Sequence, residues 1–147
     1  QRGRADAVDV DDAARELVGE HGGDQEHDHE GHYMGPPKHE PLVAAALDCV
    51  KRGELCADHC LMMLGMGNTE LKDCMRSVQT MLPMCVALAR LAALDAKRLK
   101  AYAAVCRDVC ADCEEECKKH ADKHALCKAC AESCAACIKE CKAVIDG

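Results

Sequence analysis

The C-terminal third of the chain carries cysteines at a spacing that suits metal binding. Nine cysteines lie between positions 106 and 141, and within each of two runs they are only three or four residues apart. Residues at this spacing share one face of an α-helix, so each run forms a stripe of thiols along a helix. Such a stripe usually holds leucines, and here sulfur occupies the positions expected to form the core.

Geometry favours shared metal ions over disulfide bonds within each stripe. On a helix, residues i and i+4 have Cβ atoms about 5 to 6 Å apart, whereas a disulfide requires roughly 3.5 to 4.5 Å. C-x-x-x-C pairs are therefore poorly placed to oxidise and well placed to bind one ion together. The five pairs are Cys56 with Cys60, Cys106 with Cys110, Cys113 with Cys117, Cys130 with Cys134, and Cys137 with Cys141.

Composition and periodicity predict an all-α fold. The 147 residues include neither Phe nor Trp and only two Tyr, and Ala, Leu, Met and Cys make up much of the apolar content, as in closely packed helices. Apolar residues and cysteines recur at helical spacing over four segments. We predict an up-down antiparallel four-helix bundle with a cysteine-lined core, with helices at about residues 41–64, 68–95, 99–119 and 123–145.

Residues 1–40 differ in composition from the rest of the chain. They contain no cysteine, are rich in Asp, Glu and Gly, and carry five histidines. We predict an acidic, His-rich tail over residues 1–40, with one short amphipathic helix near Val10 to Val18, and a bundle domain over residues 41–147. The chain begins at Gln1 rather than Met, from which we expect that an upstream segment such as a signal peptide has been removed.

Several classes of function are disfavoured by the sequence. The net charge of −7 and the lack of a basic patch with interleaved aromatics predict no nucleic acid binding. No apolar run approaches the roughly 20 residues of a membrane span. No hydrolytic triad or phosphate-binding loop occurs, the C-x-x-C of Cys127 and Cys130 lacks a βαβ setting, and residues 41–147 contain no E-x-x-H pair, so we predict that the protein is not an enzyme.

The predicted topology gives the two ends of the bundle different chemistry. In an up-down bundle the first and third links lie at the same end. That end should form an open mouth that gathers His59, Met62, Met63, Met66, His120 and His124. The opposite end should form an apolar plug from Leu42, Leu94, Leu99, Tyr102, Val144 and Ile145.

Sulfur ligands in this number favour Cu(I). Thiolates and thioethers are soft ligands that select Cu(I), whereas zinc is bound by thiolate, imidazole or carboxylate, usually four per ion. If each thiolate bridges two ions and each ion is held by two thiolates, the 14 cysteines hold about one ion each, and each ion neutralises one buried thiolate. The alternatives are zinc or cadmium sequestration and a helical interaction scaffold stapled by disulfides.

The segment from Cys49 to Cys141 resembles the bacterial copper storage proteins in its GELCADHC, VCADCEEEC and CKACAESCAACIKEC runs. The resemblance implies a four-helix bundle that stores many Cu(I) ions on interior cysteines, serves metal homeostasis and forms a homotetramer. It is closest to the exported branch, which has a Met-rich mouth, whereas the cytosolic branch tends to use His there. We therefore expect an exported, periplasmic or extracellular protein, with a cytoplasmic location as the alternative.

The resemblance also implies the copper ligands. His59, Met63 and Met66 would bind copper during uptake at the mouth, and the cysteines would form the store. Copper ions and a copper-accepting protein are the expected partners. The storage ligands would be Cys49, Cys56, Cys60, Cys74, Cys85, Cys106, Cys110, Cys113, Cys117, Cys127, Cys130, Cys134, Cys137 and Cys141.

Overall fold

The computed structural model describes residues 35–147, of which Pro36–Gly147 form a compact unit. Helix α2 spans Glu40–Gly65, α3 Lys72–Ala93, α4 Leu99–Lys118 and α5 Ala125–Asp146. This part of the chain contains no β-strand, and none of its helices has the length and apolar character needed to cross a bilayer. The short helix predicted near Val10 lies outside the described residues.

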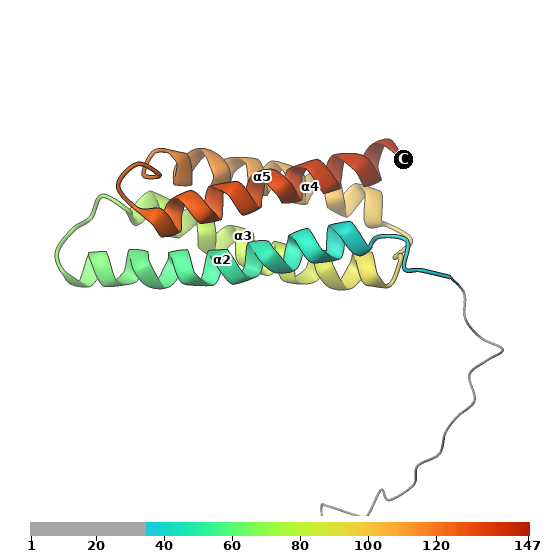
Figure 1. Ribbon diagram of the computed structural model, residues 1–147, viewed down its shortest axis with the longest axis horizontal. Coiled ribbons are helices and arrows are strands. Elements are labelled where there is room, and N and C mark those ends of the chain that lie inside the picture. Colours follow the sequence, from blue (N-terminus) through green and yellow to red (C-terminus); the bar gives the residue numbers. More distant parts are fainter. Residues whose placement is uncertain (1–34) are drawn as a thin grey trace, which may run out of the picture. The chain divides into compact units, whose positions relative to one another are not determined.

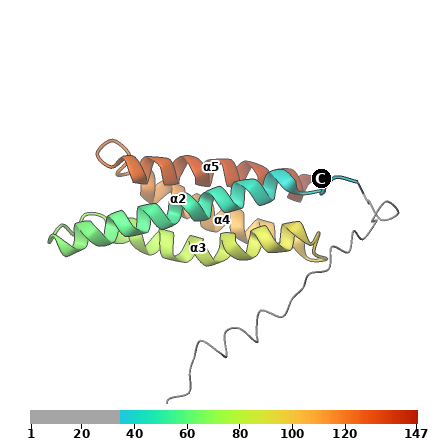
Figure 2. The same ribbon diagram turned by 60° about the horizontal axis from the view of Figure 1, so that its bottom comes forward.

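The four helices form the predicted antiparallel bundle (Figures 1 and 2). Helices α2 and α4 each pack against both α3 and α5, so the four helices form a ring around one core. The α2–α3 and α4–α5 links lie together at one end, which is called the histidine end below (Figure 1). The α3–α4 link and the start of α2 lie at the opposite end, called the far end.

The ends of α2 follow the local sequence. Pro41 occupies the first turn, where its missing N–H costs no intrahelical hydrogen bond. After Met66, the chain reverses through Gly67, whose φ of +84° lies in the left-handed region that favours glycine. The backbone N–H of Asn68 then donates to the carbonyl of Met63 at 2.9 Å and closes the helix end.

The start of α3 differs from the prediction. The sequence predicts a helix capped by Asn68 or Thr69, but α3 begins at Lys72. The Asn68 side chain accepts a hydrogen bond from the backbone N–H of Glu70 at 3.0 Å, which stabilises a turn ahead of the helix. Leu71 is fully buried directly before α3. Apolar packing, rather than a polar cap, therefore accompanies the first turn. Helix α3 then continues through Pro83, which lies on its exposed side.

The core contains nearly all of the predicted inward positions. In α3 these positions are buried throughout: Leu71, Cys74, Val78, Met81, Cys85, Leu88 and Ala92. The predicted apolar plug at the far end is only partly correct, because Leu94 is 68% exposed. Leu94 is the C-cap residue of α3 and follows the last inward position, so its side chain points away from the core. Leu42 and Leu99 are buried as predicted.

Gly53 allows α2 and α3 to approach closely. It is buried in α2 at a position where the helical stripe would otherwise carry a side chain. A Cβ atom at Gly53 would lie 2.8 Å from Cε of Met81 and 2.8 Å from Cδ2 of Leu82. These two side chains of α3 therefore occupy the space that the glycine leaves free.

We predict that Gly53→Leu lowers the free energy of unfolding by about 1–3 kcal/mol, because the new side chain must displace Met81 and Leu82 from a packed core. The measurement is urea denaturation of reduced protein followed by circular dichroism. Gly65→Ala is the matched control, since nothing lies within 4 Å of a Cβ at that position. Equal stabilities of the two variants would contradict the close approach at Gly53.

Candidate metal centre

All of the cysteine side chains are buried, and all are free thiols. The 14 cysteines lie in the four helices, each is 0% exposed, and none forms a disulfide. Ser133 is the only buried polar or charged residue between residues 35 and 147, and its hydroxyl donates to the carbonyl of Cys130 at 2.8 Å. Sulfur is therefore the only side-chain metal ligand that this part of the chain buries fully inside the bundle.

One cluster of thiols, the inner quartet, takes one cysteine from each helix: Cys49, Cys85, Cys110 and Cys137. Their Sγ atoms all lie within 4.8 Å of one another, and those of Cys85 and Cys110 are 3.6 Å apart. This separation is a non-bonded contact, because a disulfide is about 2.05 Å long. Four thiols at this spacing can bind soft metal ions with small side-chain movements.

A second cluster, the outer quartet, lies next to the histidine end. It consists of Cys56, Cys60, Cys74 and Cys127, again with all Sγ atoms within 4.8 Å. The Sγ atom of Cys56 is 3.8 Å from that of Cys127 and 3.9 Å from that of Cys74. Helices α2, α3 and α5 supply this quartet. Cys74 extends it toward α4, because its Sγ lies 3.5 Å from that of Cys117.

Two trios of thiols continue the sulfur lining between the quartets. The first trio is Cys56, Cys117 and Cys130, and the second trio is Cys113, Cys130 and Cys134. Cys56 belongs to both the outer quartet and the first trio, and Cys130 belongs to both trios. The outer quartet and the two trios therefore overlap through shared cysteines, whereas the inner quartet shares no cysteine with them.

Cys106 and Cys141 lie outside the four clusters, at the far-end limits of the α4 and α5 stripes. The Sγ of Cys106 donates to the backbone carbonyl of Met84 at 3.8 Å. Met84 also accepts from the Tyr102 hydroxyl, at 3.4 Å on its carbonyl and 3.7 Å on its sulfur. Each of the two cysteines is one helical turn from a member of the inner quartet, Cys110 or Cys137, so the stripes remain continuous.

Burial and mutual hydrogen bonding set the protonation of the thiols. Burial raises the pKa of Cys106 to about 12, with the nearby Cys141 adding to the effect. Hydrogen bonding to Cys110 holds the pKa of Cys85 above its usual range. Hydrogen bonds from Cys113 and other neighbours instead lower the pKa of Cys130, because they stabilise its thiolate. The interior therefore holds proton-donating and proton-accepting thiols side by side.

Three histidines meet at the histidine end. Nε2 of His59 in α2 lies 2.9 Å from Nδ1 of His124 at the start of α5, within hydrogen-bonding distance. The rings of His120 and His124 are 6.4 Å apart between centroids. Nδ1 of His120 is buried without a hydrogen-bond partner and lies 3.8 Å from a carboxylate oxygen of Glu70. These imidazoles lie beside the outer quartet, since Cys60 follows His59 directly.

The predicted ligand set includes His59 but not His124. The signal for His124 was present in the topology, because an up-down bundle places the α4–α5 link beside the end of α2. The methionines of this end are arranged differently from one another. Met63 is partly buried and packs against the core, whereas Met66 is 76% exposed.

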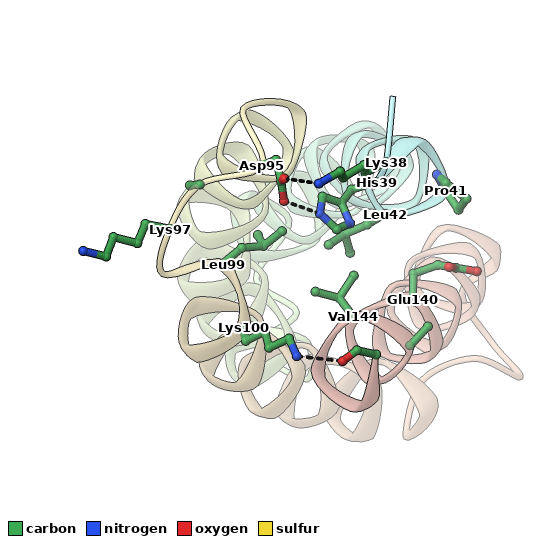
Figure 3. A pocket seen from close by; sticks show the side chains of 13 residues that line it. Lys38, His39, Pro41, Leu42, Asp95, Lys97, Leu99, Lys100, Glu140 and Val144 are labelled. Carbon is green, nitrogen blue, oxygen red and sulfur yellow. Dashed lines mark hydrogen bonds and ion pairs between the residues drawn. The ribbon is translucent and has the colours of Figure 1, made fainter. Parts of the chain in front are cut away.

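The far end holds no cluster of cysteines and is tied by charged groups. Asp95 accepts a hydrogen bond from Nζ of Lys38 at 3.1 Å, and its other oxygen lies 2.7 Å from Nε2 of His39 (Figure 3). The hydrogen bond to His39, followed by that to Lys38, lowers the pKa of Asp95. A cavity of about 580 Å³ beside these groups reaches Leu42 and Val144. The contact of Asp95 with Lys38 and His39 joins the start of α2 to the α3–α4 link.

A helical bundle with a continuous interior of free thiols belongs to the class of proteins that hold several soft metal ions. The comparisons give the particular family. The family model described as copper storage protein matches residues 37–146. The chain belongs to this copper storage protein family. A comparison with curated proteins gives no match.

Solved structures agree with this assignment. A Cu(I)-bound copper storage protein, BsCsp3, shares 30% identity over 71% of this chain and 94% of its own, with a TM-score of 0.64. The apo form of copper storage protein 3 from Bacillus subtilis shares 29% identity over 72% of this chain and 97% of its own, with a TM-score of 0.64. A cytosolic copper storage protein from Streptomyces lividans with five coppers shares 31% identity over 73% of this chain and 91% of its own, with a TM-score of 0.66.

Proposed function

We propose that this protein stores many Cu(I) ions on the cysteines of its interior. The observation that carries the proposal is the clustering of the buried thiols, because 12 of the 14 cysteines lie in groups with all Sγ atoms within 4.8 Å. Cu(I) is a soft ion that two or three sulfur ligands can hold, and shared thiolates suit such low coordination numbers. The Cu(I)-bound state of BsCsp3 supports the same assignment.

Charge balance sets the expected capacity. Each Cu(I) ion that displaces one thiol proton leaves the interior neutral, so a loading of about one ion per cysteine avoids unpaired buried charge. With 14 cysteines, the capacity is about 14 ions. We propose no catalytic step, in keeping with a storage function.

Zinc or cadmium sequestration is the second candidate function, and the two quartets favour it. Four thiolates around one ion are the usual ligand set of a structural zinc site. However, each quartet with one divalent ion would retain a charge of about −2 in a buried site. The cysteine sharing between clusters also suits bridged Cu(I) better than separate tetrahedral sites. The disulfide-stapled scaffold has no support, because all 14 thiols are free.

Anaerobic titration of the reduced protein with Cu(I), in the presence of a competing chelator, tests the proposed function. We predict saturation near one ion per cysteine, release of about one proton per ion because the buried thiols are largely protonated beforehand, and circular dichroism that shows full helix content before any metal is added. Parallel titration with Zn(II) is the control. Saturation at two to four ions with either metal would favour separate four-thiolate sites instead.

We further propose that copper enters and leaves at the histidine end. His59, Met63 and Met66 are the ligands expected from the sequence, and the contact between His59 and His124 adds a second imidazole beside the outer quartet. An imidazole or thioether can hold Cu(I) while it exchanges onto Cys60 or Cys127. At the far end, Lys38 and His39 form ion pairs with Asp95, and these groups are not sulfur ligands.

We predict that His59→Ala combined with His124→Ala slows Cu(I) loading several-fold while the final capacity stays unchanged, since no thiol is lost. The measurement is stopped-flow loading from a weak Cu(I) complex, followed by ultraviolet thiolate-to-copper absorption. His39→Ala is the matched control, because this histidine lies at the far end. If His39→Ala slowed loading more than the double variant did, uptake would occur at the far end and the proposal would be wrong.

The homotetramer and the cellular location stay predictions. The outward side of α2 supports association between copies, because Leu47, Leu55 and Met62 are each at least 50% exposed on it, and apolar patches on a helix face commonly mark interfaces. Light scattering should give a mass of about four chains, and a monomer mass would contradict the tetramer. We propose export on the basis of the Met-rich mouth. The three histidines at the same end suit the cytosolic alternative. Cell fractionation distinguishes the two locations.

A further inference from the structure

The thiol lining is not equally distributed among the four helices. In α4 and α5 a buried thiol recurs every three or four residues from Cys106 to Cys117 and from Cys127 to Cys141, and α5 also buries Ala131 and Ser133. Helices α2 and α3 interrupt theirs in the middle. Gly53 separates Cys49 from Cys56 in α2, and Val78 with Met81 separates Cys74 from Cys85 in α3. All three interrupting residues are buried.

The interruptions on the two helices lie against each other. A Cβ at Gly53 would be 2.8 Å from Cε of Met81, so Met81 extends across to the backbone of α2. The half of the bundle wall formed by α2 and α3 therefore presents close-packed apolar groups at this level. Thiols are present at this level only on the α4 and α5 side, and the sulfur of Met81 is a thioether.

The clusters show the same asymmetry. Both quartets and the first trio include cysteines from at least three helices, whereas the second trio, Cys113, Cys130 and Cys134, comes from α4 and α5 alone. Along both helices, this trio lies between the first trio and the inner quartet. Cys113 is three residues from Cys110, and Cys134 is three residues from Cys137, so each is adjacent to the inner quartet on its helix face.

From these observations we infer that the second trio is the passage by which Cu(I) moves between an outer and an inner part of the store. The inference rests on the proposed storage of Cu(I). Gly53, Val78 and Met81 narrow the passage because they occupy positions of the helical stripes where a thiol is missing. The outer part holds the five thiols of Cys56, Cys60, Cys74, Cys117 and Cys127, and the inner part holds the six of Cys49, Cys85, Cys106, Cys110, Cys137 and Cys141.

Movement through the passage is a ligand exchange without redox change. A Cu–S bond forms to the incoming sulfur while a Cu–S bond to the outgoing sulfur breaks, and the proton of the incoming thiol passes to the sulfur that is released. The copper remains Cu(I), and charge is conserved within the interior. Each step requires neighbouring thiols within a few ångströms, and in the narrow section Cys113, Cys130 and Cys134 provide them.

Loading kinetics of matched variants test the passage. The double variant Cys113→Ala with Cys134→Ala and the control Cys106→Ala with Cys141→Ala each keep 12 thiols, and circular dichroism checks their fold. We expect two loading phases in the unaltered protein, of which the slow one fills the inner part. The passage variant should slow this phase at least tenfold. The control should leave the rate of the slow phase unchanged and reduce its amplitude by about two ions.

A second pair of variants adds a thiol instead of removing two. Met81→Cys replaces a thioether with a thiol on the α3 side of the passage and should accelerate the slow phase, while Leu88→Cys adds a thiol in the same helix near the far end and should not. The passage would be overturned if, within each pair, the test variant and its control had equal slow-phase rates, or if the unaltered protein loaded in a single phase. Failure of the unaltered protein to bind about 14 ions would instead overturn the proposed storage function.

Discussion

Close packing of cysteine sulfur atoms is the interaction on which the rest of this structure depends. A thiol behaves as a small apolar group, so the stripes on four helices can face one another in the absence of metal. Sulfur contacts of 3.5 to 3.9 Å hold the helices at a distance where no bond forms between the cysteines. Under the proposed function, the same atoms become ligands once their protons are replaced by a soft cation. One set of side chains would then serve as the core of the apo fold and as the binding site.

Larger apolar residues fill the parts of the core that the small thiols do not occupy. Leu42, Leu88 and Leu99 are buried toward the far end, and Leu71 is buried at the start of α3. These leucines fill the bundle beyond the sulfur stripes, and the contact of Asp95 with Lys38 and His39 joins the start of α2 to the α3–α4 link. The bundle can therefore keep its helices in register whether or not its centre contains metal.

Helical periodicity made most of this arrangement predictable. Helices α4 and α5 match the expected ranges closely, because cysteines at every third or fourth position leave little freedom in register. The start of α3 was not predictable in the same way: Asn68 looks like a helix cap in sequence, yet its side chain stabilises a preceding turn. The predicted topology put Leu94 in the apolar plug at the far end, whereas its exposure depends on its position after the final turn of α3. The pairing of His59 with His124 required the topology as well as the pattern, and the ligand roles of all these residues stay predictions.

The complete burial of the cysteines has a consequence for how the metal content can be recognised. Each thiol is 0% exposed, so a change in occupancy alters the composition of the interior and leaves most of the outer surface as it was. A partner that contacts the outward faces of the helices would meet the same surface on empty and on full molecules. Among residues 35–147, the histidine end, where imidazoles lie beside the outer quartet, is the surface at which empty and filled molecules would differ under the proposed function.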